Sequence, residues 1–400
     1  MSETSQIIRI AARGDGVTAD GQHVAQGVPG DILHADGSLE HGPHHIAPPC
    51  VHFGQCGGCQ LQHADEDALR QFVTERVTFQ AEKHGFSIGD LLPTHLSPPR
   101  TRRRATLHAL RTARGAALGF REGSSHKIVD LKECHILRPE LGKLLPALRQ
   151  FVAQHGGKRP VDIELTLADQ GVDCSIKHLE LEGLEATEAA LEFAQSNGLA
   201  RLTLDQGYGP ETQWEPQPVT ITLSGRRVGM PPGGFLQATQ DGEDTLVADA
   251  KAWIGDALSV ADLFSGLGTF AFALANPAKV LAAEASRDAH LACKAASAGL
   301  PMAAMHRDLF RNPLQPDELN RFEAVLLDPP RAGAKEQIGQ IAASSVNRVV
   351  YISCNPVSWA RDCTKLVEAG FKLEKLRPVG QFRWSTHVEL ASYWTRVERG

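Results

Sequence analysis

The pattern of hydrophobic and polar positions changes along the chain and divides it into three parts. Before residue 45, short β-branched runs such as Ile7-Ile8-Arg9-Ile10 and Ile32-Leu33 alternate with glycine-containing turns. This pattern is typical of short strands and predicts a small β-barrel over residues 1–45, with a strand-like N-terminal arm as the alternative. The stretch HGPHHIAPP that follows, from His41 to Pro49, predicts a linker.

Residues 46–225 mix helical and strand periods, which predicts a central α+β domain. Residues 161–167 and 219–223 have the pattern of strands, and residues 183–197 have the pattern of a helix. A helix is also predicted over 66–84, where apolar side chains recur at helical spacing. The side chains expected in the core from that helix are Leu69, Phe72, Val73, Val77 and Phe79.

Residues 226–400 alternate strand-like runs with helical patterns, which predicts an α/β domain with a mostly parallel sheet. The clearest run is Val349-Val350-Tyr351-Ile352, and it ends at Ser353-Cys354-Asn355-Pro356, because proline cannot continue the hydrogen-bonded ladder. Cys354 is thus expected at the carboxyl end of a strand, where open α/β sheets bind ligands. Taken alone, the run favours a small buried core thiol over a nucleophile.

Two features of this domain indicate a site for an adenosine-containing ligand. The strand at 259–264 leads into Ser265-Gly266-Leu267-Gly268-Thr269, whose glycines allow a ligand to approach a helix N-terminus. Glu284 ends the next strand and is placed to bind ribose hydroxyls, although the full GxGxxG fingerprint is absent. Asp308 follows a third segment and is expected either to accept from an adenine amine or to cap a helix.

A fourth strand, at 324–327, ends in Asp328-Pro329-Pro330-Arg331. The two prolines hold the Asp328 carboxylate rigidly at the edge of the sheet, beside the glycine loop. This motif is typical of methyltransferases that act on nucleobases. A salt bridge at the rim between Asp328 and Arg331 is the alternative.

Four cysteines early in the chain have spacing that suits a metal. Cys56 and Cys59 form a Cys-x2-Cys pair, with Cys50 before it and Cys134 after a long gap. Four thiolates suit either structural zinc or an iron–sulfur cluster, and the spacing does not choose between them. A redox pair without the usual βαβ context and a set of unligated core cysteines are the other two interpretations.

The composition excludes a protein that spans a membrane. The 400 residues are 42% hydrophobic and 22% charged, and no apolar run approaches the roughly 18 residues that a membrane span needs. The N-terminal sequence has no signal-peptide pattern, so a cytosolic protein with reduced cysteines is expected.

The net charge is −6, yet residues 100–132 contain nine Lys and Arg against Glu122 and Asp130, which is 9 − 2 = +7. This window predicts contact with RNA phosphates or, alternatively, a solvated basic face.

Taken together, these motifs resemble the RNA uracil-5-methyltransferases that depend on S-adenosylmethionine. The resemblance covers nearly the whole chain and adds Gly233-Gly234-Phe235-Leu236-Gln237 and His387-Val388-Glu389 to the motifs above. The four cysteines are similar to those of members with a 4Fe–4S cluster, and residues 5–45 resemble a shortened TRAM barrel. A chain that has both the cluster cysteines and the barrel resembles the branch of the family that acts on 23S rRNA. The chain departs from the family at Ser265, Thr269, Gly380, Arg383 and Ser385.

The resemblance implies a Rossmann-like class I methyltransferase domain and a role for each motif residue. Cys354 would be the nucleophile that adds to C6 of uracil, and Glu389 would accept the C5 proton. Asp328 and Arg331 would orient the base, and flipping of that base is expected. The other expected roles are cofactor binding by Gln237, Phe264, Gly266, Gly268, Thr269, Glu284, Asp308 and Asp328; cluster binding by Cys50, Cys56, Cys59 and Cys134; and RNA binding by Arg102, Arg103, Arg104 and Arg121.

Other functions remain open at this level. Methylation of a tRNA uridine would use the same chemistry. An RNA cytosine-5 methyltransferase would usually have a cysteine where Arg331 stands. A non-catalytic iron–sulfur RNA-binding protein is a third possibility, against which the intact Cys354, Asp328 and Glu389 argue. A monomer without a protein partner is expected.

Overall fold

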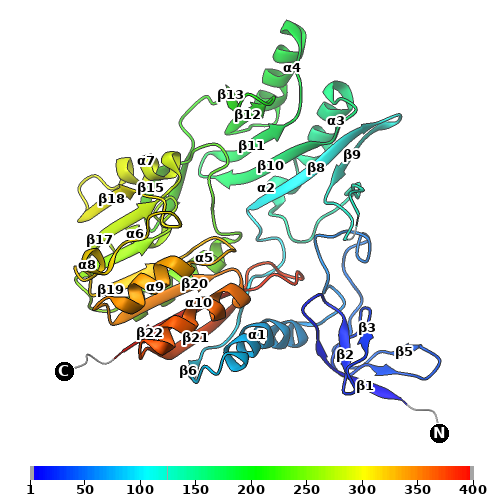
Figure 1. Cartoon of the computed structure of the whole chain (residues 1–400). Coiled ribbons are helices and arrows are strands. Elements are labelled where there is room, and N and C mark those ends of the chain that lie inside the picture. The colour runs from blue at the N-terminus through cyan, green and yellow to red at the C-terminus, as the bar shows by residue number, and fades with distance from the viewer. Residues whose placement is uncertain (1–3, 124, 397–400) are drawn as a thin grey trace.

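The N-terminal module, drawn in dark blue in Figure 1, is a five-stranded antiparallel sheet with the strand order β3-β2-β1-β4-β5. The computed structural model describes residues 4–123 and 125–396. Residues 1–3, 124 and 397–400, which the predicted domains include, lie outside the described residues. The module is strand-rich, as predicted, and buries Ile7 and Val28. Its strands are β1 (Ser5–Ile10), β2 (Gly16–Thr18), β3 (His23–Val24), β4 (Ile32–Leu33) and β5 (Leu39–Glu40).

The central domain is built on a six-stranded sheet with the order β13-β12-β11-β10-β8-β9. Its neighbouring strands are antiparallel except for β11 and β12, and helix α3 packs on β8 and β9. The strands are β8 (Arg104–Thr112), β9 (Gly115–Gly119), β10 (Val161–Ala168), β11 (Gly171–Lys177), β12 (Arg201–Asp205) and β13 (Pro210–Trp214); the helices are α2 (Pro139–Gly142), α3 (Leu145–His155) and α4 (Gly183–Ser196).

The C-terminal domain contains a larger sheet whose main path is β18-β17-β16-β19-β20-β22-β21-β6, with β7 beside β21. The strands from β18 to β20 are parallel, as predicted, and β22 runs antiparallel to β20. The chain leaves β16 in one direction and returns to β19 on its other side, which creates a topological switch point. The strands are β6 (Ile88–Leu91), β7 (His95–Leu96), β16 (Ser259–Leu263), β17 (Lys279–Glu284), β18 (Met302–His306), β19 (Ala324–Leu327), β20 (Arg348–Ser353), β21 (Lys372–Gly380) and β22 (Glu389–Thr395).

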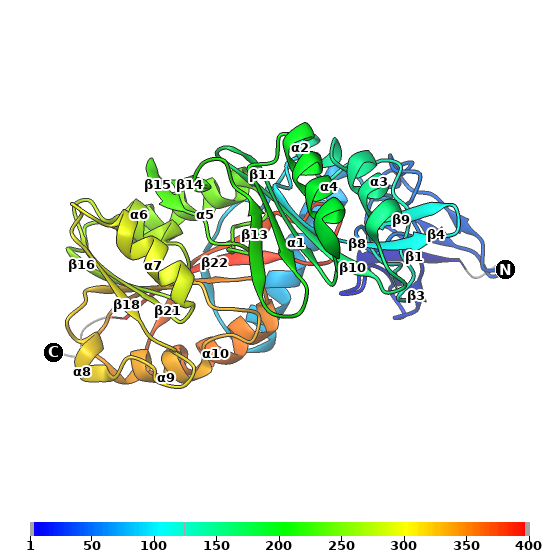
Figure 2. The same ribbon diagram turned by 90° about the horizontal axis from the view of Figure 1, so that it is seen from above.

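Helices cover both faces of this sheet. Figure 2 shows α5, α6 and α7 on one face and α8, α9 and α10 on the other. No helix within residues 4–123 and 125–396 is long and apolar enough to cross a membrane. The helices are α5 (Gln240–Ile254), α6 (Thr269–Leu274), α7 (Arg287–Ala296), α8 (Pro316–Leu319), α9 (Lys335–Ala343) and α10 (Pro356–Glu368); a hairpin, β14 (Thr220–Leu223) and β15 (Arg226–Gly229), packs against α6 and α7.

One early segment, which the sequence placed in the central domain of residues 46–225, packs with the C-terminal sheet. Helix α1 (Glu66–Lys83) packs on α10 and β21, and β6 pairs in parallel with β21. Residues 66–96 therefore belong with the C-terminal sheet, although they lie within residues 46–225, which the sequence predicts to form the central domain. The sequence hides this arrangement, because an edge strand of four residues finds its partner nearly 300 positions away.

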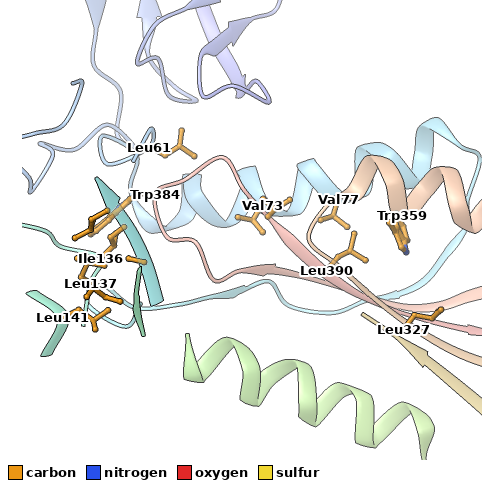
Figure 3. Packing of buried hydrophobic residues seen from close by; sticks show 14 of the residues in the cluster. Leu61, Val73, Val77, Ile136, Leu137, Leu141, Leu327, Trp359, Trp384 and Leu390 are labelled. Atoms are coloured by element: carbon orange, nitrogen blue, oxygen red, sulfur yellow. The ribbon is translucent and has the colours of Figure 1, made fainter. Parts of the chain in front are cut away.

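The core runs without a break from the central domain into the C-terminal sheet. In Figure 3, Val73 and Val77 of α1 point toward Leu390 of β22, while Trp384 lies beside Ile136 and Leu137 of the central domain. This shared core fixes the two domains relative to each other. The predicted core residues of α1 are buried except Phe79, which is 57% exposed because it lies on the opposite face of the helix.

Candidate active site

A cavity of about 740 Å³ opens at the carboxyl edge of the large sheet, at the switch point between β16 and β19. The ends of β16, β17, β19 and β20 form its floor, and the start of β8 and the segment before α5 form its opposite wall. The side chains relevant to chemistry that line it are Arg102, Arg104, Phe235, Gln237, Phe264, Gly266, Glu284, Phe310, Asp328, Arg331, Cys354, Gln381, Phe382 and Glu389.

The glycine loop, residues 265–269, shapes the cofactor side of this cavity, and its two glycines have different roles. Gly266 has φ +54, and a Cβ there would meet nothing within 4 Å, so its missing side chain leaves open space at the cavity. A Cβ on Gly268, with φ +96, would lie 2.6 Å from the Phe272 ring and 3.0 Å from Cys293 Sγ. Gly268 therefore permits close packing of α6 rather than ligand contact.

Glu284 buttresses the glycine loop as well as facing the cavity. Its Oε2 accepts from the amide of Gly266 over 2.8 Å, and its Oε1 accepts from the amide of Ser286 over 2.7 Å. Each carboxylate oxygen can accept a further hydrogen bond from a ribose hydroxyl. Among the described residues, Thr269 and Asp308 are not part of the cavity wall; Asp308 Oδ1 instead accepts from the amide of Phe310 over 3.0 Å.

Cys354 lies at the carboxyl end of β20, as predicted, and faces the cavity. Ser353 pairs with Leu390 in the antiparallel ladder of β20 and β22, which brings Cys354 and Glu389 next to each other one step further on. Burial raises the pKa of the Cys354 thiol to about 11, and the Glu389 and Asp328 carboxyls contribute to that rise. A thiol with this environment must lose a proton before it can react as a nucleophile.

Two carboxyl groups lie beside Cys354: Glu389 is buried and Asp328 is half-buried. Burial raises the pKa of Asp328 to about 7, although a hydrogen bond of 3.0 Å from Gln237 Nε2 opposes that rise. Burial, with a further contribution from Asp328, raises the pKa of Glu389 to about 8, and Gln381 opposes it by donating to Oε2. Carboxyls with pKa values near neutrality are suited to proton transfer.

The loop after β19 is joined to the loop that carries Cys354. The main-chain oxygen of Arg331 accepts from Asn355 Nδ2 over 3.0 Å and from Ser358 Oγ over 3.1 Å. Asn355 also caps α10 through the amide of Val357. Asp328, Arg331 and Cys354 thus come from adjacent strand ends that share hydrogen bonds, and the predicted grouping of these residues is what the fold produces.

The four arginines expected to bind RNA lie in different environments. The guanidinium carbon of Arg102 is 5.4 Å from the centre of the Phe382 ring, and that of Arg104 is 4.8 Å from the centre of the Phe235 ring, both at the cavity. Arg121 lies in the loop that bridges to Ile128, and its Nη1 is 3.3 Å from His126 Nδ1.

Arg103 differs from the other three arginines because it is buried, so the prediction that it binds RNA is wrong. Its side chain is 5% exposed and forms an ion pair of 2.5 Å with Glu243, which is 4% exposed. It also donates to the main-chain oxygen of Gln237 over 3.1 Å. A guanidinium that is buried and fully engaged in this way is held inside the protein and not offered to a phosphate.

Cys50, Cys56, Cys59 and Cys134 line one small pocket together with the rings of Phe53 and Phe120. Burial raises the pKa of Cys59 to about 12, and its three partner thiols add to the rise. Within residues 4–123 and 125–396, no three His, Cys, Asp or Glu side chains stand close enough to hold a metal ion as they are arranged.

The donor set nevertheless fits a thiolate-bound group, because all four thiols line the same small pocket and main-chain amides face two of them. The amide of Gly58 donates to Cys56 Sγ over 3.5 Å, and backbone hydrogen bonds from Ile136 and Leu137 reach Cys134. Such donors favour the ionised thiol that metals require.

Sequence reasoning missed Gln381 and the stacking partners of the arginines. Gln381 belongs to none of the motifs above, so nothing in the pattern singled it out. Phe235 belongs to the motif Gly233–Gln237, but its contact with Arg104, and that of Phe382 with Arg102, join segments that are far apart in the sequence.

Comparisons with known proteins give the family of the chain. Residues 248–397 match the family model described as tRNA (Uracil-5-)-methyltransferase. An uncharacterized RNA methyltransferase of Zymomonas mobilis is 51% identical over 98% of this chain and 100% of its own length. The 23S rRNA (uracil(1939)-C(5))-methyltransferase of Erwinia tasmaniensis is 29% identical over 95% of this chain and 88% of its own.

Among solved structures, the tRNA (uracil-54, C5)-methyltransferase of Pyrococcus abyssi, in complex with S-adenosyl-L-homocysteine, has the same fold. Its TM-score is 0.73 at 19% identity, over 99% of this chain and 100% of that one. The mixed α/β methyltransferase fold is therefore confirmed over the whole chain. With the near full-length relative at 51% identity, these matches show that the chain is an enzyme of the RNA (uracil-5-)-methyltransferase family.

Proposed function

We propose that this enzyme transfers a methyl group from S-adenosylmethionine to C5 of a uridine in 23S rRNA, through a covalent bond between Cys354 and C6. The observation that carries the proposal is the presence of Cys354, Glu389 and Asp328 in one cavity beside a glycine loop and Glu284. A thiol next to two carboxyls of raised pKa is suited to the nucleophilic activation of a pyrimidine.

The cofactor side of the cavity supports S-adenosylmethionine as the methyl donor. Gly266 leaves open space at the helix N-terminus, Glu284 has acceptor capacity for ribose hydroxyls, and the Phe264 and Phe310 rings lie 5.3 Å apart at the same end. When bound, S-adenosylmethionine supplies an electrophilic methyl group on a positively charged sulfur.

The side chains then divide the reaction into two steps. The Cys354 thiolate adds to C6, and the electron pair of the C5–C6 double bond moves onto C5 and O4, so that C5 becomes the nucleophile for the methyl group. After methylation, Glu389 takes the proton from C5. The electrons of the C5–H bond restore the double bond, and the C6–S bond breaks to release Cys354 as a thiolate.

Asp328 and Arg331 are proposed to orient the uracil, because both line the cavity on the side of Cys354. Since Cys354 lies inside the cavity, the target base has to leave its stack to reach it. Arg102 and Arg104 at the cavity, together with Arg121 on the central domain, are proposed to hold the flanking RNA backbone.

The four early cysteines are proposed to hold a 4Fe–4S cluster. Such a cluster would be structural, because it would join the segment of residues 50–59 to the loop at Cys134. The residues after Cys134 are tied to the cavity wall, because the amide of Arg102 donates to the main-chain oxygen of Ile136 and its main-chain oxygen accepts from the amide of Arg138. No step of the methyl transfer is assigned to it.

A tRNA uridine is the second candidate substrate, favoured by the family model that matches residues 248–397. The full-length likeness to a 23S rRNA enzyme favours ribosomal RNA. The same measurement separates the two: nucleoside mass spectrometry of 23S rRNA and tRNA, purified separately from a strain that lacks this gene.

The gene is returned as wild type, as Cys354→Ala, or as Cys363→Ala, which alters a fully buried thiol of α10 away from the cavity. We expect 5-methyluridine to be lost from one position of 23S rRNA and restored by the wild type and Cys363→Ala but not by Cys354→Ala. Loss from tRNA alone would establish the second candidate, and an unchanged content in both RNAs would contradict the proposal.

A further inference from the structure

The side chain of Gln381 lies between the buried carboxyl group of Glu389 and the half-buried one of Asp328. Its Nε2 donates to Glu389 Oε2 and, over 2.8 Å, to Gln237 Oε1. Gln237 Nε2 in turn donates to Asp328 Oδ2 over 3.0 Å. Gln381 is 2% and Gln237 is 3% exposed. Two buried amides therefore form a continuous chain of hydrogen bonds from Glu389 to Asp328.

One main-chain group fixes the direction of this chain. The amide N–H of Ala238 donates to Gln381 Oε1 over 3.0 Å, and because an N–H group can only donate, the oxygen of the Gln381 amide has to face it. The amino group of Gln381 then faces Glu389. Gln237 must present its oxygen to Gln381 and its amino group to Asp328. Both carboxyls therefore receive a hydrogen bond from an amino group, which favours their ionised forms.

The first turn of α5 holds Gln381 in this place. A Cβ added to Gly242 would lie 3.0 Å from Gln381 Cβ and 2.8 Å from Thr239 Oγ1, so helix and side chain touch because residue 242 is a glycine. Gln381 directly follows β21, whose antiparallel partner β22 begins with Glu389. The glutamine is thus fixed from both sides and cannot turn its amide without losing several hydrogen bonds.

We propose that Gln381 is the positioning residue for proton removal: it engages Oε2 of Glu389 and leaves Oε1 as the atom that takes the proton from C5. This inference rests on the proposed function. In that step the C5–H bond breaks, its electron pair forms the C5–C6 double bond, and the C6–S electrons leave with Cys354. The proton ends on Oε1, while Oε2 keeps the hydrogen bond that Gln381 donates to it.

The other charged groups around Glu389 allow the effect of this amide to be isolated. Asp328 raises the pKa of the Glu389 carboxyl, whereas the hydrogen bond from Gln381 lowers it. Cys354 and Arg331 lie on the same side, at the ends of β20 and β19. On the side of α5, Asp241 and Glu243 are each held in an ion pair, with His95 and Arg103.

The test is a pair of variants, Gln381→Met and Gln381→Glu, compared with the matched control Gln337→Met. Gln337 is also a fully buried glutamine with two hydrogen bonds, both to Leu314, but it lies in α9 outside the cavity. Gln381→Glu keeps the size of the side chain and the contact with Ala238, and its carboxyl donates to Glu389 only while it is protonated, so the donor is lost as pH rises. This variant guards against a loss of folding in Gln381→Met. The rates of methyl transfer and of RNA release are measured separately in single-turnover reactions between about pH 6 and 9.

We expect methyl transfer to change by less than about 3-fold in both Gln381 variants, while release of RNA slows and the covalent protein–RNA species accumulates on denaturing gels. Loss of the donor raises the pKa of Glu389, so the pH at which release reaches half its maximum moves upward by about one unit. The Gln337→Met enzyme keeps the wild-type profile. Folded Gln381 variants with wild-type release at every pH would overturn the inference. A wild-type enzyme that forms no methyluridine would instead overturn the proposed function on which the inference rests.

Discussion

Arg103 and Glu243 form a buried ion pair of 2.5 Å that joins the start of the central sheet to helix α5 of the C-terminal domain. Arg103 stands among three consecutive arginines in the most basic window of the chain, yet it is turned inward, whereas Arg102 and Arg104 face the cavity. The alternation of a strand accounts for this difference, because neighbouring side chains point to opposite faces.

Replacing Arg103 should therefore damage stability rather than RNA binding. Arg103→Met leaves the Glu243 carboxylate buried without its partner, and we expect the free energy of unfolding to fall by about 3–5 kcal/mol in urea titrations. Arg103→Met combined with Glu243→Leu should recover most of that loss, because no buried charge remains.

Arg121→Ala is the matched change at a partly exposed arginine of the same window. It should alter stability by less than about 0.5 kcal/mol while weakening RNA affinity. If Arg103→Met kept full stability and lost RNA affinity, the assignment of Arg103 to the interior would be wrong.

The buried Glu389 carboxyl should make stability depend on pH. Its pKa in the folded protein, about 8, lies above the ordinary value of 4.5, so its contribution is fully present below that ordinary value and is lost as pH rises toward 8. Glu389→Gln removes this dependence. We expect the variant to become more stable than the wild type by about 2–4 kcal/mol as pH rises from about 5 to 9.

The measurement is thermal or urea unfolding at a series of pH values. Glu336→Gln, which changes an exposed glutamate at the start of α9, serves as the control and should follow the wild type throughout. Parallel stability curves for Glu389→Gln and the wild type would contradict the placement of an ionisable Glu389 in the interior.

The two glycines of the loop after β16 should respond differently to alanine. Gly268→Ala forces a Cβ against Phe272 and Cys293 and adds backbone strain, so we expect a loss of about 2–4 kcal/mol in unfolding free energy. Gly266→Ala meets open space at the cavity and should cost only about 1 kcal/mol.

Affinity for S-adenosylmethionine, measured by calorimetry, should show the reverse order: Gly266→Ala weakens binding by occupying ligand space, more than its effect on stability accounts for. Gly299→Ala, at φ +79 with no atom within 4 Å of the added Cβ, isolates the cost of the backbone strain alone. Equal losses of stability in Gly268→Ala and Gly299→Ala would show that the Phe272 contact is not what limits this position.

The four early cysteines should bind iron as one unit. Protein purified without oxygen is expected to contain about four iron and four sulfide ions per chain, with absorption in the visible range. Replacing any one of Cys50, Cys56, Cys59 or Cys134 by alanine should remove most of that iron, whereas Cys174→Ala, in the core of the central sheet, should retain it. Protein with zinc and no iron, or with no metal and unchanged stability, would contradict the cluster.

The strand ends that carry the chemistry could be predicted from sequence, and their partners could not. Runs of apolar residues locate the ends of β19 and β20, and therefore Asp328 and Cys354, because burial of a strand on both faces favours such runs. The polar partners follow from tertiary packing. Gln381 meets Gln237 across 144 positions of sequence, and Arg103 meets Glu243 across 140. Phe79 was assigned to the core because helical spacing gives a period but does not set the width of the buried face.

The most direct test of the account is the mass of the covalent complex formed with a short RNA in which 5-fluorouridine replaces the target uridine. Fluorine at C5 cannot be removed as a proton, so the enzyme should stop after methylation with Cys354 still bound to C6. We predict a species equal to protein, RNA and one methyl group, with the RNA mapped by peptide sequencing to Cys354 and no such species from Cys354→Ala. Methylation of the normal RNA by Cys354→Ala, or an adduct mapped to another residue, would contradict it.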